Sequence, residues 1–212
     1  MNKSLKEERD RAKRSDILDA AARCFMQHGY DATSVDQIAD CYGSTKGLIY
    51  YHFRSKTDLF FEVYRTAIQR TIDRAEPIAA SHAPGVERLE AMCRGHILGM
   101  MQNLAYHHVS KQGVELHMSN ALTPDQNAVL RDLITLRDVY ERLYVSVIAA
   151  GREDGSLACR DPRLAARTLL GALNGFSVWY RPRDRQSQAQ REVLAQDVTS
   201  LILKGIVAHA SP

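Results

Sequence analysis

Apolar residues recur along this chain at three- and four-residue intervals, the spacing that places them on one face of an α-helix. Long β-branched runs that alternate strictly between apolar and polar residues are absent. The prolines agree with helices, because Thr123-Pro124 and Asp161-Pro162 each place a capping residue before a proline at the first helical position. The pattern predicts an all-α fold of about nine helices.

Two short periodic segments, residues 34–41 and 45–52, predict a helix-turn-helix. Ser34 opens a capping box, in which the side chain of Gln37 reaches back to the amide of the capping residue. Gly43 permits a tight turn between the two segments. Two helices joined by a short turn with glycine can present the second helix to the major groove of DNA.

The charge around these segments also favours DNA binding. The net charge of the chain is only +3, but residues 42–57 contain Lys46, Arg54 and Lys56 and no acidic residue. Residues 1–14 hold six Lys/Arg against three Asp/Glu and are predicted to form a flexible basic arm. A helix over residues 15–28, ended by Gly29, is expected to follow. Hydroxyl and imidazole donors that can reach phosphate oxygens are interleaved with the cations, at Ser44, Thr45, Tyr50, Tyr51, His52 and Ser55.

Residues 14–60 resemble the DNA-binding domain of the tetracycline-repressor (TetR) family throughout. The motifs are F-x-x-x-G-Y at the end of the first helix, then T-S-V-x-x-I-A, then K-G-L-I-Y-Y-H-F-x-S-K-x-x-L. The resemblance implies a three-helix DNA-binding domain over residues 15–60, with Ile49 and Phe53 in its core. It implies base or groove contacts from Thr45, Lys46, Leu48 and Tyr50, and phosphate contacts from Thr33, Tyr51, His52 and Lys56.

Two departures from the family pattern affect the DNA sequence that would be recognised. Tyr42 and Ser44 replace the small and aliphatic residues that are common in the turn. Leu48 stands where the family often has threonine, and it can contact a thymine methyl group but cannot donate a hydrogen bond. DNA binding is still expected, whereas the operator sequence is left open.

Residues 61–212 are predicted to form a helical domain for ligand binding and dimerisation. The helix expected over 162–181 is apolar on several faces, so it needs more partners than one monomer easily supplies. The resemblance implies a homodimer built from the last two helices, and the alternative is that this helix lies at the centre of the monomer. The residues expected at the interface are Trp179, Leu194, Val198 and Leu201.

A ligand pocket is expected around the methionine-rich helix that begins near Leu89, because methionine adapts well to apolar ligands. The alternative is that the methionines are core filling and that His96 is a satisfied core residue. Arg137 lies on the apolar face of its helix and could meet an anion or extend to water. Arg181 could bind phosphate or pair with the carbonyls that end its helix. The predicted ligand residues are Met92, His96, Met100, Met101, Arg137, Tyr144 and Arg181.

A second, shorter resemblance concerns the stretch GALNGFSVWYRPRDRQS, residues 171–187. It looks like the end of the eighth helix in TetR-family repressors of fatty-acid and steroid breakdown, several of which respond to acyl-CoA thioesters. The resemblance implies a long pocket that is partly apolar and partly suited to anions, with Arg181 or Arg183 as phosphate partners.

The sequence therefore predicts a transcriptional regulator, in the form of a repressor released from an inverted-repeat operator by a small molecule such as an acyl-CoA or lipid metabolite. A regulator of the same family that senses drugs or aromatic compounds is the alternative. A structural DNA-binding protein would need a more basic surface. An enzyme is not expected, because no nucleophile elbow, P-loop or Rossmann glycine pattern is present.

Neither a cofactor nor a metal site is predicted. The four cysteines are scattered without a C-x-x-C pair, and no two of the histidines near residue 107 are four residues apart with a carboxylate to complete a site. The N-terminus is polar, and no apolar run approaches the roughly 20 residues that a membrane span needs. A cytoplasmic protein is therefore expected.

Overall fold

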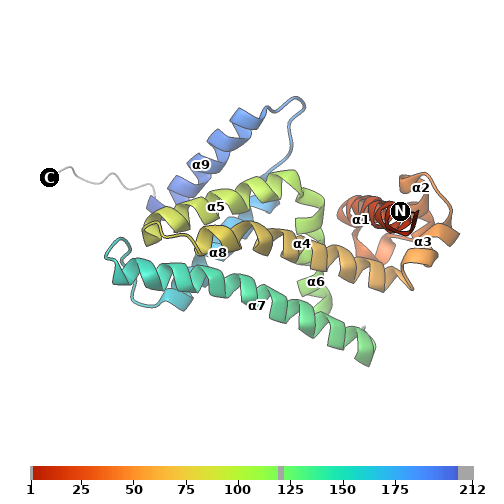
Figure 1. Ribbon diagram of the computed structural model, residues 1–212, viewed down its shortest axis with the longest axis horizontal. Coiled ribbons are helices and arrows are strands. Elements are labelled where there is room, and N and C mark those ends of the chain that lie inside the picture. Colours follow the sequence, from red (N-terminus) through yellow and green to blue (C-terminus); the bar gives the residue numbers. More distant parts are fainter. Residues whose placement is uncertain (1, 119–121, 205–212) are drawn as a thin grey trace. The chain divides into compact units, whose positions relative to one another are not determined.

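The computed structural model describes residues 2–118 and 122–204, and the side chains of residues 5–113 and 122–204. Within these ranges the chain forms nine helices and no strand, which confirms the predicted all-α fold (Figure 1). Among the described residues, none of the helices has the combination of length and hydropathy that a membrane span requires. The helices are α1 (Asn2–Ala32), α2 (Val35–Tyr42), α3 (Lys46–His52), α4 (Lys56–Ala79), α5 (Gly85–Gln102), α6 (Leu104–Met118), α7 (Pro124–Glu153), α8 (Pro162–Trp179) and α9 (Gln188–Lys204).

The helices make up two compact units. Unit 1 consists of Met1–Ile68 and Ala105–Ile134, and unit 2 of Gln69–Leu104 and Thr135–Pro212. The division falls inside α4 and α7, so both helices contribute residues to both units. This division differs from the domain boundary that the sequence predicts after residue 60. That boundary marks the end of the DNA-binding motif, whereas unit 1 also includes most of α6 and the start of α7.

The core of unit 1 is built on the apolar face of α1. Ile17, Ala21 and Phe25 are fully buried, as their spacing predicts. The ring of Phe25 packs edge-on against that of Phe60, with 5.2 Å between the ring centroids. α2 packs against α1, and α3 packs against α2.

The start of α1 differs from the sequence prediction. The helix begins at Asn2 and not near Ser15, so residues 2–14, expected to be a flexible arm, are helical. Lysine, arginine and glutamate have good helix propensity, which explains the extension. Arg14 also forms an ion pair with Glu62 of α4. Gly29 interrupts α1 as predicted, with a positive φ of 79° that glycine adopts without strain.

α4 continues through Pro77 to Ala79, although a proline inside a helix usually ends it. Proline has no N–H, so it leaves the carbonyl of Asp73 without its helical partner. Asp73 is exposed, and water can satisfy that carbonyl. For this reason a proline in the last turn does not end the helix.

In unit 2, α5 packs against α8 and α9. Its N-terminus is held by the loop after α7, where Asp154 accepts a hydrogen bond from the amide of Gly85 (2.7 Å) and Ser156 accepts one from the amide of Val86 (3.1 Å). The backbone of α5 at Gly85 lies very close to the backbone of α7 at Gly151. A Cβ added to Gly85 would lie 2.2 Å from the Cα of Gly151. α8 begins at the predicted cap, Asp161, and α9 begins after a capping box of Ser187 and Gln190.

Candidate nucleic-acid interface and ligand site

α2 and α3 form the predicted helix-turn-helix. The hydroxyl of Ser34 accepts from the amide of Gln37 (3.1 Å), and the Gln37 side chain accepts from the amide of Ser34 (2.7 Å), which completes the capping box. Gly43 ends α2 in the left-handed conformation, with φ 76° and ψ 37°. The amide of Ser44 then donates to the carbonyl of Ala39 (3.0 Å), so the turn leads directly into α3.

α3 has one buried side and one exposed side. Ile49 and Phe53 are buried, and the guanidinium of Arg14 lies over the Phe53 ring, 4.9 Å from its centroid. On the other side Tyr50 and Tyr51 are 47% and 71% exposed, and tyrosine is among the residues enriched at the centres of interfaces. Thr45 and Lys46 are also exposed, whereas Ser44, Leu48 and His52 are half-buried.

The first turn of α3 provides a hydroxyl and an ammonium group. Thr45 occupies the capping position, but its side chain makes no capping hydrogen bond, so the hydroxyl can turn outward. The ammonium of Lys46 pairs with the carboxylate of Asp36 on α2, with 2.8 Å between Nζ and Oδ2. The hydrogen bond that Lys46 donates to this carboxylate raises the pKa of Lys46. No sequence signal points to the role of Asp36, because residues ten positions apart on separate helices share no local pattern.

Two of the expected phosphate contacts have side chains that turn into the domain. Thr33 is buried, and its hydroxyl donates to the carbonyls of Gly29 (2.6 Å) and Cys24 (3.3 Å). The side chain of Thr33 therefore faces the protein and not the solvent. The ammonium of Lys56 donates to the carbonyls of Tyr30 (2.9 Å) and Asp31 (3.3 Å), which leaves one of its three N–H groups for another acceptor.

The interior of unit 2 contains a chain of buried polar groups. Nδ1 of His96 lies 2.9 Å from the hydroxyl of Tyr140, which lies 3.0 Å from the hydroxyl of Tyr144. Burial lowers the pKa of His96 to about 4, so the imidazole is neutral at pH 7. This row of hydrogen bonds links two predicted ligand residues, His96 and Tyr144, through Tyr140. Neither of the two side chains carries a formal charge at pH 7.

The other predicted ligand residues divide into two groups. Met92, Met100 and Met101 are buried on α5, together with His96. Arg137 is exposed, so it does not occupy the apolar face that its spacing from Leu133 and Tyr140 predicted. A long arginine side chain can leave an apolar face for water at little cost, and the spacing cannot exclude this outcome.

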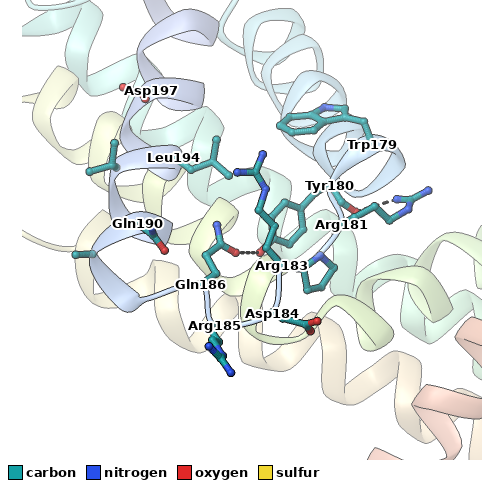
Figure 2. Close-up of a pocket in the computed structure, with 13 residues that line it drawn as sticks. Trp179, Tyr180, Arg181, Arg183, Asp184, Arg185, Gln186, Gln190, Leu194 and Asp197 are labelled. Atoms are coloured by element: carbon teal, nitrogen blue, oxygen red, sulfur yellow. Dashed lines mark hydrogen bonds between the residues drawn. The ribbon is translucent and has the colours of Figure 1, made fainter.

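The segment after α8 forms a groove with α9 (Figure 2). Its volume is about 800 Å³, and Arg181, Arg183 and Arg185 are among its lining residues. Arg181 donates to the carbonyls of Tyr180 (2.8 Å) and Val178 (3.1 Å), which is the helix-closing role foreseen as its alternative. Arg183 reaches back along the groove toward Leu194, whereas Arg181 points away from α9 (Figure 2).

α8 and α9 expose large apolar side chains. Trp179 and Leu201 are 56% and 54% exposed, and the other two predicted interface residues, Leu194 and Val198, are half-buried. Three further apolar residues on these helices are exposed, although they are not among the four predicted interface residues. These are Leu164, Val178 and Val193, which are 64%, 59% and 61% exposed.

The geometry of α1–α3 defines a helix-turn-helix DNA-binding domain, because the second helix is fixed from behind and presents donors to the solvent. Comparison with known proteins agrees. Residues 17–63 match the family model for bacterial regulatory proteins of the tetR family, and residues 82–206 match that for the tetracyclin repressor-like C-terminal domain. The chain belongs to the TetR family and is a DNA-binding transcriptional regulator.

Relatives of similar length extend over almost the whole chain. The transcriptional repressor KstR2 of Rhodococcus jostii is 27% identical over 199 residues, which is 92% of each chain. The fatty acid metabolism regulator protein of Bacillus subtilis is 26% identical over 200 residues, covering 92% of this chain and 96% of that protein. The crystal structure of the TetR family regulator PfmR from Thermus thermophilus has a TM-score of 0.76 at 29% identity, covering 91% of this chain and 99% of the other.

Proposed function

We propose that this regulator is a cytoplasmic repressor, which binds an inverted-repeat operator as a homodimer and leaves it when an acyl-CoA or a related lipid metabolite binds. It acts by binding alone, without catalysis. The observation that supports DNA recognition most directly is the exposed face of α3. Tyr50 and Tyr51 stand out from a helix whose opposite side is anchored by Ile49 and Phe53. The base or groove contacts are assigned to Thr45, Lys46, Leu48 and Tyr50.

The homodimer is supported by the exposed apolar side chains of α8 and α9. Contiguous exposed apolar surface commonly marks an interface, and most soluble homo-oligomers are two-fold dimers. The partner we propose is a second copy of this chain, whose α8 and α9 would complete a four-helix interface around Trp179 and Leu201. A two-fold dimer has two α3 helices, so it requires an operator with two inverted half-sites.

The interior of unit 2 supports an effector that is mainly apolar but has a polar group. Methionine side chains on α5 can rearrange around an acyl chain, while the hydroxyls of Tyr140 and Tyr144 can hydrogen-bond a thioester or keto oxygen. Two of the relatives are a regulator of fatty acid metabolism and the repressor KstR2. The phosphates of a CoA group would bind arginines of the groove between the segment after α8 and α9, and Arg183 is better oriented for this than Arg181.

Release follows if the effector binds better to an arrangement that does not fit the operator. α4 and α7 belong to both compact units, so a shift of these helices in unit 2 would alter their packing in unit 1. The expected result is a change in the spacing of the two α3 helices within the dimer, which would then no longer match successive major grooves.

The test begins with a duplex that the protein selects from a random library. Acyl-CoAs of graded chain length are titrated into the complex of the protein with this duplex, and release is followed by fluorescence anisotropy. Free CoA and the corresponding fatty acids serve as controls. We expect release by acyl-CoAs within a limited range of chain length. Release by an uncharged aromatic drug, with none by any acyl-CoA, would instead support a drug-sensing regulator.

A further inference from the structure

The ion pair between Asp36 and Lys46 lies at the edge of the recognition surface. Lys46 is the first residue of α3, and Asp36 lies in the first turn of α2. Both side chains remain in contact with water, with 48% of Lys46 and 62% of Asp36 exposed. The carboxylate therefore neutralises a cation that is otherwise directed at DNA, and it does so at a place that DNA can reach.

We propose that Asp36 is a specificity-determining residue. Its carboxylate competes successfully with DNA phosphates for the ammonium of Lys46, whereas acceptors on the edge of the correct base displace it. The inference rests on the proposed contact between Lys46 and the operator. An exposed ion pair is weak, worth about two- to fivefold in an equilibrium constant. A DNA phosphate is, like the Asp36 carboxylate, an oxygen anion with one negative charge. If Lys46 exchanges the carboxylate for a phosphate, the binding free energy therefore improves little.

A guanine in the major groove offers Lys46 more than a phosphate does. It presents two acceptors, N7 and O6, and a good contact to them discriminates against the wrong base by about fivefold or more. That gain exceeds the loss of the exposed pair with Asp36. The carboxylate therefore reduces the affinity for random DNA more than the affinity for the operator, and so widens the ratio between the two.

Lys56 provides a contrast on the same domain. Its ammonium is held by two backbone carbonyls, which are neutral, so its positive charge is not cancelled. Lys46, in contrast, has its charge paired with a carboxylate. Asp40 offers a matched control, because it is an exposed aspartate on α2 like Asp36.

The experiment compares Asp36→Asn with Asp40→Asn in the full-length protein. Each variant removes one negative charge from α2, but only the first releases Lys46. Affinity is measured at several salt concentrations for the library-selected duplex and for a scrambled duplex of the same composition. For Asp36→Asn we expect a two- to fivefold gain on the scrambled duplex, a salt slope steeper by about one unit, and a smaller gain on the selected duplex. Asp40→Asn should alter both affinities by the same factor.

The variant Lys46→Met tests the coupling, since in its background Asp36→Asn should no longer change the ratio of the two affinities. Equal effects of Asp36→Asn and Asp40→Asn, or an effect of Asp36→Asn that persists beside Lys46→Met, would overturn the inference and leave the proposed function intact. If the wild-type protein enriches no sequence from the library, operator recognition itself fails and the inference falls with it. Thermal melts establish that each variant is folded.

Discussion

The ammonium of Lys56 lies 2.9 Å from the carbonyl oxygen of Tyr30 and 4.4 Å from the centroid of the Tyr30 ring. Lys56 is the first residue of α4, and Tyr30 lies just beyond the interruption of α1 at Gly29. The hydroxyl of Tyr30 in turn hydrogen-bonds Thr57 at 2.6 Å. These contacts fasten the end of α1 to the start of α4, so a lysine expected only to touch phosphate also stabilises the DNA-binding domain.

Lys56→Ala should therefore reduce both stability and DNA binding. The loss of the carbonyl hydrogen bonds and the cation–π contact is expected to cost about 1–2 kcal/mol of unfolding free energy. The salt slope of DNA binding should fall by about one unit for the lost phosphate contact. Urea unfolding and salt-dependent binding measure the two effects. Arg54→Ala is the control, because Arg54 is an exposed neighbouring cation, and a wild-type unfolding midpoint for Lys56→Ala would refute the fastening role.

Leu201→Glu should produce a folded monomer. Leu201 is 54% exposed on α9, so the substitution disturbs no core, whereas a carboxylate at the centre of an apolar dimer interface would be buried without a partner. Sedimentation velocity measures the association state. Leu5→Glu is the matched control, because Leu5 is equally exposed at 53% but lies on α1. A dimer as stable as wild type in Leu201→Glu would place the interface elsewhere.

Acidification should destabilise unit 2 through His96. The folded pKa is about 4 and the ordinary value is 6.5, so the unfolded chain takes up the proton first. The contribution of His96 to the free energy of unfolding is therefore fully present above pH 6.5. It is lost as the pH falls toward 4, by roughly 3 kcal/mol in total. Urea unfolding at a series of pH values measures this loss. His96→Gln should flatten the pH dependence within that window, and an unchanged profile would show that another group is responsible.

Gly85→Ala should destabilise the protein, because the added methyl group would meet the backbone of Gly151 at 2.2 Å and backbone cannot move aside easily. The expected cost is about 1–3 kcal/mol, as for other overpacked sites. Gly95→Ala on the same helix is the control. Its Cβ would find the side chain of Arg74 at an ordinary 3.5 Å, so better helix propensity should stabilise it by up to about 1 kcal/mol. Calorimetric melting temperatures in the reverse order would contradict this packing.

Local sequence signals were sufficient for the existence of the helices and for several of their ends, although not for the start of α1. Ser34 and Asp161 cap helices where predicted, and Gly43 forms the turn of the helix-turn-helix. Capping and turn formation depend on residues within about four positions of each other, so the sequence contains all the necessary information. The family motif over residues 14–60 likewise predicted a DNA-binding regulator from the sequence alone.

Only the tertiary structure decided which groups those helices bring together. Asp36 meets Lys46, Lys56 meets Tyr30, and the His96–Tyr140 pair joins α5 to α7. Each pair is separated by at least ten residues, and helical periodicity specifies a face but not its partner. The same limit explains why Arg137 was assigned to an apolar face although it lies in water, since a flexible side chain follows its surroundings and not its spacing.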